Sequence, residues 1–322
     1  TGATNTNNAT DTYVGWFWNA GDTDGKTYTV KVVSDSGNKY RFDDFGTSAV
    51  TLDLAEGGTY IFDQSDSSNA GHPLRFYTAA DKTGGEYTTG VTTAGTAGSS
   101  GAYTQIVVAA SAPTLFYQCS VHAGMGGQAN TNSTLGSSNF DGTLQSTVKA
   151  NATAGFSVVT YTGTGSNGTV GHGLGVKPDS YWVKRRTGGL GDWMVFHKDL
   201  GSTKNQRLNE GLSTFTQATI WNNTDPTSSV VNIGTSSAVN GNGSTYVFYA
   251  FSEVAGYSKF GSYTGNGSTD GTFVFTGFRP AFILWKPSTQ ANTNWVMVDN
   301  KRDTYNVVDA YLLADVGNNV SG

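Results

Sequence analysis

Short runs in which apolar and polar residues alternate recur along most of the chain, and Gly, Asn, Ser and Thr separate them. A period of two is typical of β-strands with one buried face. Over residues 26–130 these runs are TYTVKVV, NKYRF, AVTLDL, GTYIFD, HPLRFY, TQIVVAA and TLFYQC. The only helical candidate is a short one at residues 303–313. We therefore predict an all-β protein, with a Greek-key sandwich or barrel over residues 26–130.

The second half of the chain contains an internal repeat with a spacing of 102 residues. GFSVVTYTGTGSNGT at residues 155–169 resembles YSKFGSYTGNGSTDGT at residues 257–272. The same spacing joins two prolines and two tryptophans, namely Pro178 to Pro280 and Trp193 to Trp295. A constant spacing over such a distance indicates two copies of one structural unit. We predict tandem β-sandwich repeats at residues 151–255 and 256–322, the second of them incomplete.

An aromatic strand of one pattern occurs twice. The first repeat closes with TYVFYAF at residues 245–251, and TYVGWFW at residues 12–18 has the same pattern. We interpret residues 1–25 as the closing strand of a preceding repeat followed by a linker. Two explanations remain open for this strand: the chain is a window cut from a longer repeat protein, or the strand completes the open repeat of a neighbouring subunit by strand addition. We favour the first.

Two further segments lack the alternating pattern. Residues 131–150 begin with the polar stretch TNSTLGSSN and are predicted to be a linker. Residues 78–102 consist mainly of Gly, Thr, Ser and Ala and are predicted to form an exposed loop. These assignments give a first domain at residues 26–130, followed by the linker and the two repeats.

Composition narrows the possible functions. Only 13% of the residues are charged and the net charge is −5, so no basic stripe is present for a nucleic acid. No run of ~18 apolar residues could span a membrane, and the N-terminus does not resemble a signal peptide. A single cysteine excludes an intrachain disulfide. Without a catalytic triad, a phosphate loop or paired carboxylates at a meaningful spacing, we predict no enzyme activity.

The stretch CSVHAGM, residues 119–125, concentrates three scarce residue types. Cys119, His122 and Met125 offer a thiolate, an imidazole and a thioether within one turn, and His72 stands at the start of a predicted strand 47 residues before the cysteine. Two histidines and a cysteine with a weak axial methionine form a blue-copper site. We therefore predict copper bound by these four residues. Zinc accepts the same donors, the site could be left without metal, and a metal-free role with a packed cysteine is the alternative.

A histidine followed much later by C-x₂-H-x₂-M, near the end of an all-β segment of this length, resembles the cupredoxin family. The resemblance covers about a third of the chain and implies a Greek-key sandwich. It also implies copper ligation by His72, Cys119, His122 and Met125. The long loop at residues 78–102 departs from the electron-carrying members of the family, and so does the position of the domain beside repeats.

The remaining sequence resembles modules of structural proteins from marine tailed phages, including phages of cyanobacteria. NFDGTLQSTVKANATAGFSVVTYTGTGSNGT, GYSKFGSYTGNGSTDGTFVFTGFRP and HPLRF with CSVHAGMGGQANT carry this resemblance. It implies a virion surface appendage such as a tail fibre, in contact with further copies of itself, with other virion proteins or with a host glycan or receptor. Two alternatives remain open: a secreted or periplasmic copper or electron-transfer protein, and a glycan-binding adhesin.

Other candidate sites carry weaker signals. His172 and His197 have no matching ligand set, and we interpret both as structural. Asp22 and Asp24 in GDTDGK resemble the start of a calcium loop but lack the rest of it, so a plain turn is favoured. Tryptophans could bind glycans but more often fill sandwich cores; the candidates are Trp182, Trp221 and Trp285.

Overall fold

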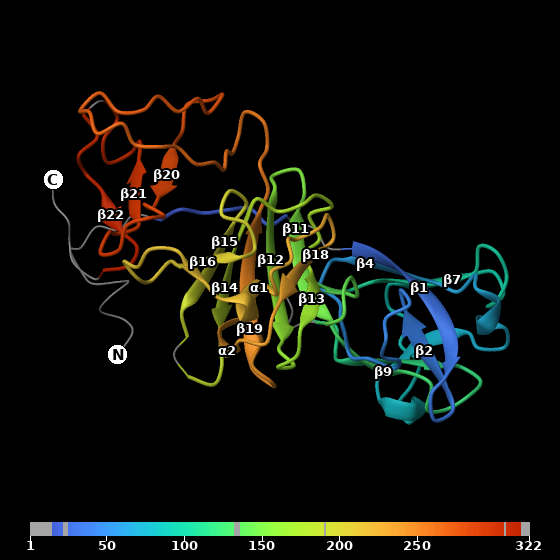
Figure 1. Ribbon diagram of the computed structural model, residues 1–322. Helices are drawn as coiled ribbons and strands as arrows, with labels where there is room; N and C mark the ends of the chain where they lie inside the picture. The colour runs from blue at the N-terminus through green and yellow to red at the C-terminus, as the bar shows by residue number, and fades with distance from the viewer. Residues whose placement is uncertain (1–14, 22–24, 132–135, 190, 306, 317–322) are drawn as a thin grey trace.

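The computed structural model describes residues 15–21, 25–131, 136–189, 191–305 and 307–316, and the regular secondary structure of these residues is nearly all β (Figure 1). The all-β sandwich prediction is therefore confirmed. A first domain contains two sheets, a second domain contains a large sheet with a two-stranded partner, and a small sheet follows. Among the residues that the structure describes, no helix has the length and apolar character needed to cross a bilayer.

The first domain is a sandwich of a five-stranded and a four-stranded sheet. The first sheet has the order β2-β1-β4-β7-β6, with β1 (Gly25–Ser34), β2 (Asn38–Phe42), β4 (Thr59–Asp63), β6 (Val91–Ala94) and β7 (Tyr103–Val107). The second has the order β3-β9-β8-β5, with β3 (Leu52–Asp53), β5 (Leu74–Tyr77), β8 (Leu115–Cys119) and β9 (Gly127–Asn130). Two short 3₁₀ helices, η1 (Ser67–Asn69) and η2 (Ala80–Lys82), lie in the connections.

The core of this sandwich follows directly from the alternating pattern. Phe62 on β4 is fully buried between two half-buried neighbours, and Tyr117 on β8 is fully buried as well. Aromatic rings from both sheets meet in this core; for example, the ring centroids of Phe42 and Tyr117 are 5.1 Å apart. Each large side chain buried in this way contributes about 1.5–3 kcal/mol to stability. Such packing explains how the domain holds together without a disulfide.

The second domain is built on an eight-stranded sheet of order β10-β11-β12-β19-β14-β15-β16-β17. Its strands are β10 (Ser137–Asn139), β11 (Ser146–Asn151), β12 (Phe156–Thr162), β14 (Ser180–Arg185), β15 (Trp193–His197), β16 (Lys204–Arg207), β17 (Phe215–Thr216) and β19 (Thr245–Phe251). One face is covered by β13 (Gly168–Gly171), β18 (Val230–Ile233), α1 (Ala218–Trp221) and α2 (Ser237–Asn240). Trp221 is fully buried between these layers, so it fills the core and is no glycan ligand.

The segment at residues 131–150, which we predicted to be a linker, is structured wherever it is described. It contains β10 and the start of β11, which pair with each other. Phe140 enters the core of the first domain, and Tyr28 of that domain donates a hydrogen bond from its hydroxyl to the carbonyl oxygen of Ser138 (2.9 Å). The polar sequence misled us because its serines pair across the domain boundary instead of facing solvent.

The small sheet at the end of the chain repeats part of the second domain. Its strands are β20 (Phe282–Trp285), β21 (Val296–Asp299) and β22 (Leu312–Leu313). Phe282 faces Asp299 just as Ser180 faces His197, and each residue of the first pair lies 102 residues after its counterpart in the second. A structural detail is repeated as well, because Lys184 donates to the carbonyl oxygen of Gly191 and Lys286 to that of Thr293.

The second copy is formed only in part. Residues 258–264, which correspond to β12, contain no strand, and Tyr263 is 57% exposed whereas its counterpart Tyr161 is 5% exposed. The helix predicted at residues 303–313 is not present in the described part of that segment, which contains β22 instead. Likewise, the predicted loop at residues 78–102 contains η2 and β6.

His172 illustrates how burial sets the protonation of a structural residue. Its Nδ1 accepts a hydrogen bond from the backbone N–H of Leu174 (3.2 Å), and its Nε2 lies 3.3 Å from the carbonyl oxygen of Thr227. The ring is therefore neutral, with its proton on Nε2. Burial lowers the pKa of His172, although the contact with Thr227 and the charge of Asp141 oppose this effect.

The free energy of unfolding should therefore fall as the pH drops below about 6.5, because the unfolded chain takes up a proton that buried His172 excludes. His72 and His197 also have lowered pKa values and add to this slope. We expect His172→Gln to remove part of the slope, measured by urea unfolding of metal-free protein between about pH 5 and 7.5. An unchanged slope in the variant would contradict this assignment.

Candidate metal centre

Strand pairing in the first domain brings the two halves of the predicted ligand set together. β5 and β8 are antiparallel neighbours in which Leu74 faces Cys119. His72 lies just before β5, and the backbone N–H of Ser120 donates to the carbonyl oxygen of Pro73 (3.0 Å), which extends the ladder past the strand ends. The extended register places His72 opposite Val121, between Cys119 and His122 along the neighbouring chain, so His72 lies close to both.

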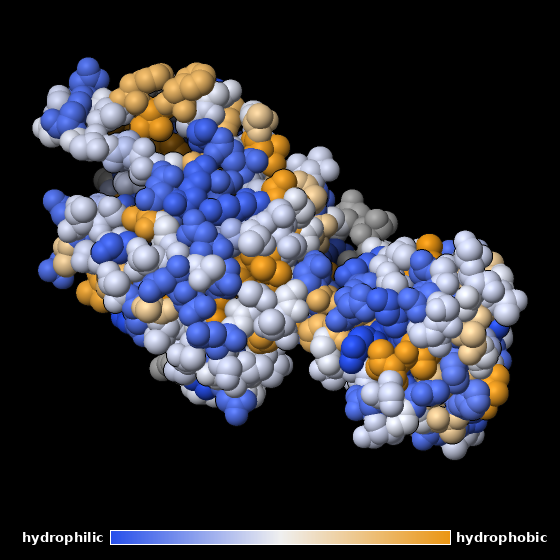
Figure 2. All heavy atoms as spheres, turned by 45° about the vertical axis from the view of Figure 1, so that its right-hand side comes forward, coloured by the Kyte–Doolittle hydropathy of each residue, from blue (hydrophilic) through white to orange (hydrophobic). Residues whose placement is uncertain are grey.

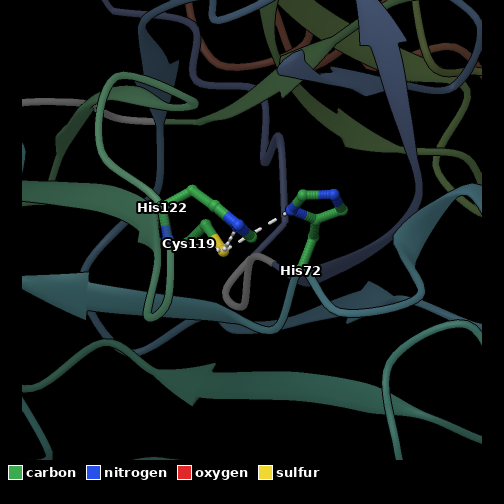
Figure 3. Close-up of side chains that lie close together, drawn as sticks. All are labelled: His72, Cys119 and His122. Atoms are coloured by element: carbon green, nitrogen blue, oxygen red, sulfur yellow. Dashed lines mark hydrogen bonds between the residues drawn. The ribbon is translucent and has the colours of Figure 1, made fainter.

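Three of the four predicted ligands form one cluster (Figure 3). The Cys119 Sγ lies 3.8 Å from His72 Nδ1 and 3.6 Å from His122 Nδ1. All three potential ligand atoms lie within 4.8 Å of one another. Cys119 is fully buried and His122 is exposed, so the sulfur is shielded while one imidazole reaches the surface.

The loop that follows β8 also contacts the Cys119 sulfur through a backbone N–H. The N–H of His122 donates to Cys119 Sγ at 3.4 Å. This contact fixes the sulfur against the loop, so that it faces the imidazole of the same turn. The cluster is thus prepared on its sulfur side by the same turn that supplies the second imidazole.

Met125, the fourth predicted ligand, is buried in the hydrophobic core that also contains Cys119. Its backbone is fixed at both ends: Gln118 Oε1 accepts from the N–H of Met125 (3.1 Å), and the carbonyl oxygen of Met125 accepts from the N–H of Tyr40 (2.9 Å). Gln118 Oε1 also accepts from the N–H of Gly126 (3.0 Å). The end of the ligand loop is therefore held independently of any metal.

The neighbouring strand β2 supports both sides of the cluster. Tyr40 donates a hydrogen bond from its hydroxyl to the carbonyl oxygen of His72 (2.7 Å), and Lys39 donates to the carbonyl oxygen of Gly124. The Asn38 amide lies 3.4 Å from His72 Nε2, on the side of the ring away from Cys119. A metal on Nδ1 would leave the proton on Nε2. The Asn38 side chain would then turn its amide oxygen toward the ring and accept a hydrogen bond from that N–H.

A second support comes from η2, in the segment that we predicted to be a simple exposed loop. Asp81 Oδ1 accepts from the N–H of Gly124 (3.0 Å), and Lys82 Nζ donates to the carbonyl oxygen of Ser120 (3.2 Å). Asp81 and Lys82 have φ values of 49° and 64°, which are uncommon for residues other than glycine. Residues with a strained backbone that hydrogen-bond to a ligand loop are typical of functional sites. No sequence signal marked them.

Local electrostatics favour the ligand form of His72. Burial lowers the pKa of His72, and the nearby imidazole of His122 adds to this effect. Neutral imidazole is the form that binds a metal, so fewer protons must be displaced. Burial, together with Cys119, raises the pKa of Tyr40, which keeps its hydroxyl protonated as the donor to His72.

The other candidates do not form comparable sites. Within the described ranges, the group of His72, Cys119 and His122 is the one set of three or more His, Cys, Asp or Glu side chains arranged to hold a metal. His197 ends β15, beside Lys198, which pairs with Asp179 (2.9 Å) and Glu253 (3.1 Å). Asp22 and Asp24 lie outside the described residues.

Comparison with known proteins finds a family model, and its match begins where the first domain ends. A family model described as a domain of unknown function (DUF7483) matches residues 129–321, well over half of the chain. The match begins within β9, so nearly all of the sandwich with the cluster precedes it. No curated protein and no solved structure matches the chain.

Gln118 tests how strongly the ligand loop is held without metal. Gln118→Met keeps the length of the side chain but removes the acceptor for two backbone N–H groups. We expect a loss of about 1–3 kcal/mol in the unfolding free energy of the metal-free protein. Gln105→Met on β7 is the matched control. Equal stabilities of the two variants would show that the loop is not held in this way.

Proposed function

We propose that this chain, which belongs to the DUF7483 family, is a structural component of a phage virion surface appendage that carries a copper-binding module at residues 26–130. The observation that carries the copper assignment is the convergence of His72, Cys119 and His122 within 4.8 Å. The residues come from two separate parts of the chain, and strand pairing alone brings them together.

The donor set fits copper by its chemistry. Two imidazoles and a buried cysteine sulfur, with a methionine in the same core, combine nitrogen and soft sulfur donors, and this combination suits copper. For a given site, Cu²⁺ binds more tightly than Zn²⁺, so zinc is the weaker competitor. Bound copper would supply one-electron redox chemistry, and the protein would supply a fixed, partly shielded ligand set. We assign Met125 as the weak fourth ligand because it shares the core around Cys119.

The supporting hydrogen bonds determine what the chain itself contributes. Tyr40 fixes the backbone of His72, while Asp81 and Lys82 hold the loop that carries His122. Such outer contacts are worth about 10–100-fold in metal affinity in characterised sites. The proposed site is therefore formed before the metal binds, and metal loading stabilises an already folded domain.

The structural role rests on the resemblance to phage appendage modules and is supported by the character of the surface. Phe273 is 85% exposed and Phe275 is 77% exposed, in the part of the chain next to β20. Figure 2 shows hydrophobic side chains gathered over the end of the molecule that carries the small sheet. Exposed apolar clusters of this kind favour contacts with other proteins, here further copies or other virion proteins. The proposal includes no catalytic activity.

Electron transfer by a secreted or periplasmic protein is the second candidate, and one observation favours it. His122 is exposed, and its neighbour Val121 is 61% exposed, so a ligand and an apolar side chain reach the surface together. A redox partner could approach there. Reversible cycling of the copper-loaded chain with a partner protein would favour this candidate over a purely structural role.

Addition of Cu²⁺ to the reduced, metal-free protein should produce an intense visible absorption band from charge transfer between thiolate and copper. We expect one copper per chain by elemental analysis and no band in Cys119→Ser. Met125→Leu should retain copper but shift the band, because the axial ligand tunes the site.

His197→Ala is the matched control, since it removes a histidine remote from the cluster and should leave the band unchanged. The copper assignment would be wrong if the parent protein bound no copper, or if it bound zinc in preference and developed no band.

The virion assignment predicts that the chain is present in purified phage particles. Antibodies against the second domain should label an appendage in electron micrographs, and peptides from both domains should be found in washed particles. Recovery of the chain only from the periplasm or the medium of uninfected bacteria would contradict the assignment, whatever the metal content.

A further inference from the structure

The small sheet at the end of the chain leaves one strand edge open. In the second domain β19 lies between β12 and β14, with Phe251 opposite Ser180. In the small sheet β20 corresponds to β14, and among the described residues its other edge has no paired strand. An open edge exposes unpaired N–H and C=O groups that accept a further strand. The occupant expected from the repeat is a strand of the TYVFYAF type.

The sequence TYVGWFW at residues 12–18 has this pattern, and its described residues, 15–18, lie at this edge. The ring of Phe282 on β20 is 5.2 Å from that of Trp16 and 6.1 Å from that of Trp18. Alignment of TYVGWFW with TYVFYAF equates Trp18 with Phe251, and the repeat spacing equates Phe282 with Ser180. This register puts Trp18 opposite Phe282 and Trp16 two residues along on the same face, from where its ring also reaches Phe282 as a diagonal neighbour.

Side-chain exposure also alternates along this segment. Trp16 is partly buried, Phe17 is 95% exposed, and Trp18 is less exposed than Phe17, at 40%, with its ring against Phe251 of the second domain. By the same alignment Phe17 corresponds to Ala250, which faces Tyr181 on the core side of the sheet. The counterpart of Tyr181 is Ile283, which is 44% exposed. Phe17 and Ile283 thus match a cross-strand pair on the uncovered face of the small sheet.

We propose that residues 15–18, which contact β20 through their rings and form no ladder with it in this structure, pair with β20 as the closing strand of the second repeat, supplied by the opposite end of the same chain. Trp18 also lies 6.3 Å from Phe156 and 6.0 Å from Phe251 of its own second domain, measured between ring centroids. Six residues, 19–24, connect it to β1 and span roughly 20 Å at most. Because Trp18 contacts both its own second domain and β20, the segment already lies beside this edge within one chain, which favours its own chain over a second copy.

This pairing does not depend on the metal and adds an interaction to the proposed function. The strand carries three aromatic residues in four positions, and in the second domain the equivalent strand supplies core residues such as Phe248. Closure in this way joins the part of the chain before the first domain to the part after the second. The first domain then lies between two segments that are both held by the repeats.

Engineered cysteines test the register directly, because Cys119→Ser gives a chain without other thiols. The register places Trp16 opposite Leu284, so Trp16→Cys with Leu284→Cys should form an intrachain disulfide on mild oxidation. Trp16→Cys with Ile283→Cys is the control, since a shift of one residue points to the other face. Non-reducing gels and peptide mapping would identify the product.

An intrachain disulfide in the first pair but not in the control is the expected result. A disulfide between chains would show that a second copy supplies the strand, and no disulfide would show that residues 15–18 do not pair with β20; either result overturns the proposal. Hydrogen exchange on the chain without cysteine substitutions is the second measurement. Trp16→Gly with Trp18→Gly should speed exchange at β20 and leave β14 unchanged, and equal protection would also overturn it.

Discussion

The packing of Phe140 into the core of the first domain joins that domain to the second. Phe140 follows β10, a strand of the second domain, yet its ring lies 5.6 Å from Tyr28, 6.0 Å from Phe42 and 5.3 Å from Phe45. The two sheets of the first domain need this ring to fill their core at one end. Nearby, Thr147 donates to Asp53 Oδ2 at 2.5 Å across the same boundary. The orientation of the first domain is therefore set by core packing instead of by a flexible tether.

A domain fixed in this way can hold the three ligand side chains together before any metal binds. The ligand atoms of the candidate site stand at the ends of β5 and β8, whose inner residues belong to the same core as Phe140. The conformational entropy lost when His72 approaches Cys119 is thus part of the folding of the domain. Hydrogen bonds from β2 and η2 hold the loop after β8, which carries His122. Small metal-dependent domains differ, because in them the metal itself drives folding.

Much of this structure could be predicted from sequence, for identifiable reasons. Alternating strands predicted the sheets, and the 102-residue spacing predicted the shared register of β14 and β20. The cluster of His72, Cys119 and His122 could be predicted because its residue types are scarce and chemically specific. Asp81 and Lys82 could not, since their role depends on a loop conformation that no local pattern encodes. β10 was missed because its polar residues become buried only against the other domain.

The repeat also explains why the first domain can sit where it does. In the second domain, consecutive strands β11 and β12 lead into the sandwich, and β19 returns to close it between β12 and β14. A chain that leaves one closing strand and enters the next repeat passes along a single edge of these sheets. Residues 19–21 follow that course, because a side chain at Gly21 would meet the carbonyl oxygen of Ala150 on β11 at 3.3 Å. A domain inserted between those points starts and ends at the same edge, so it can be carried by the repeats without breaking either sheet.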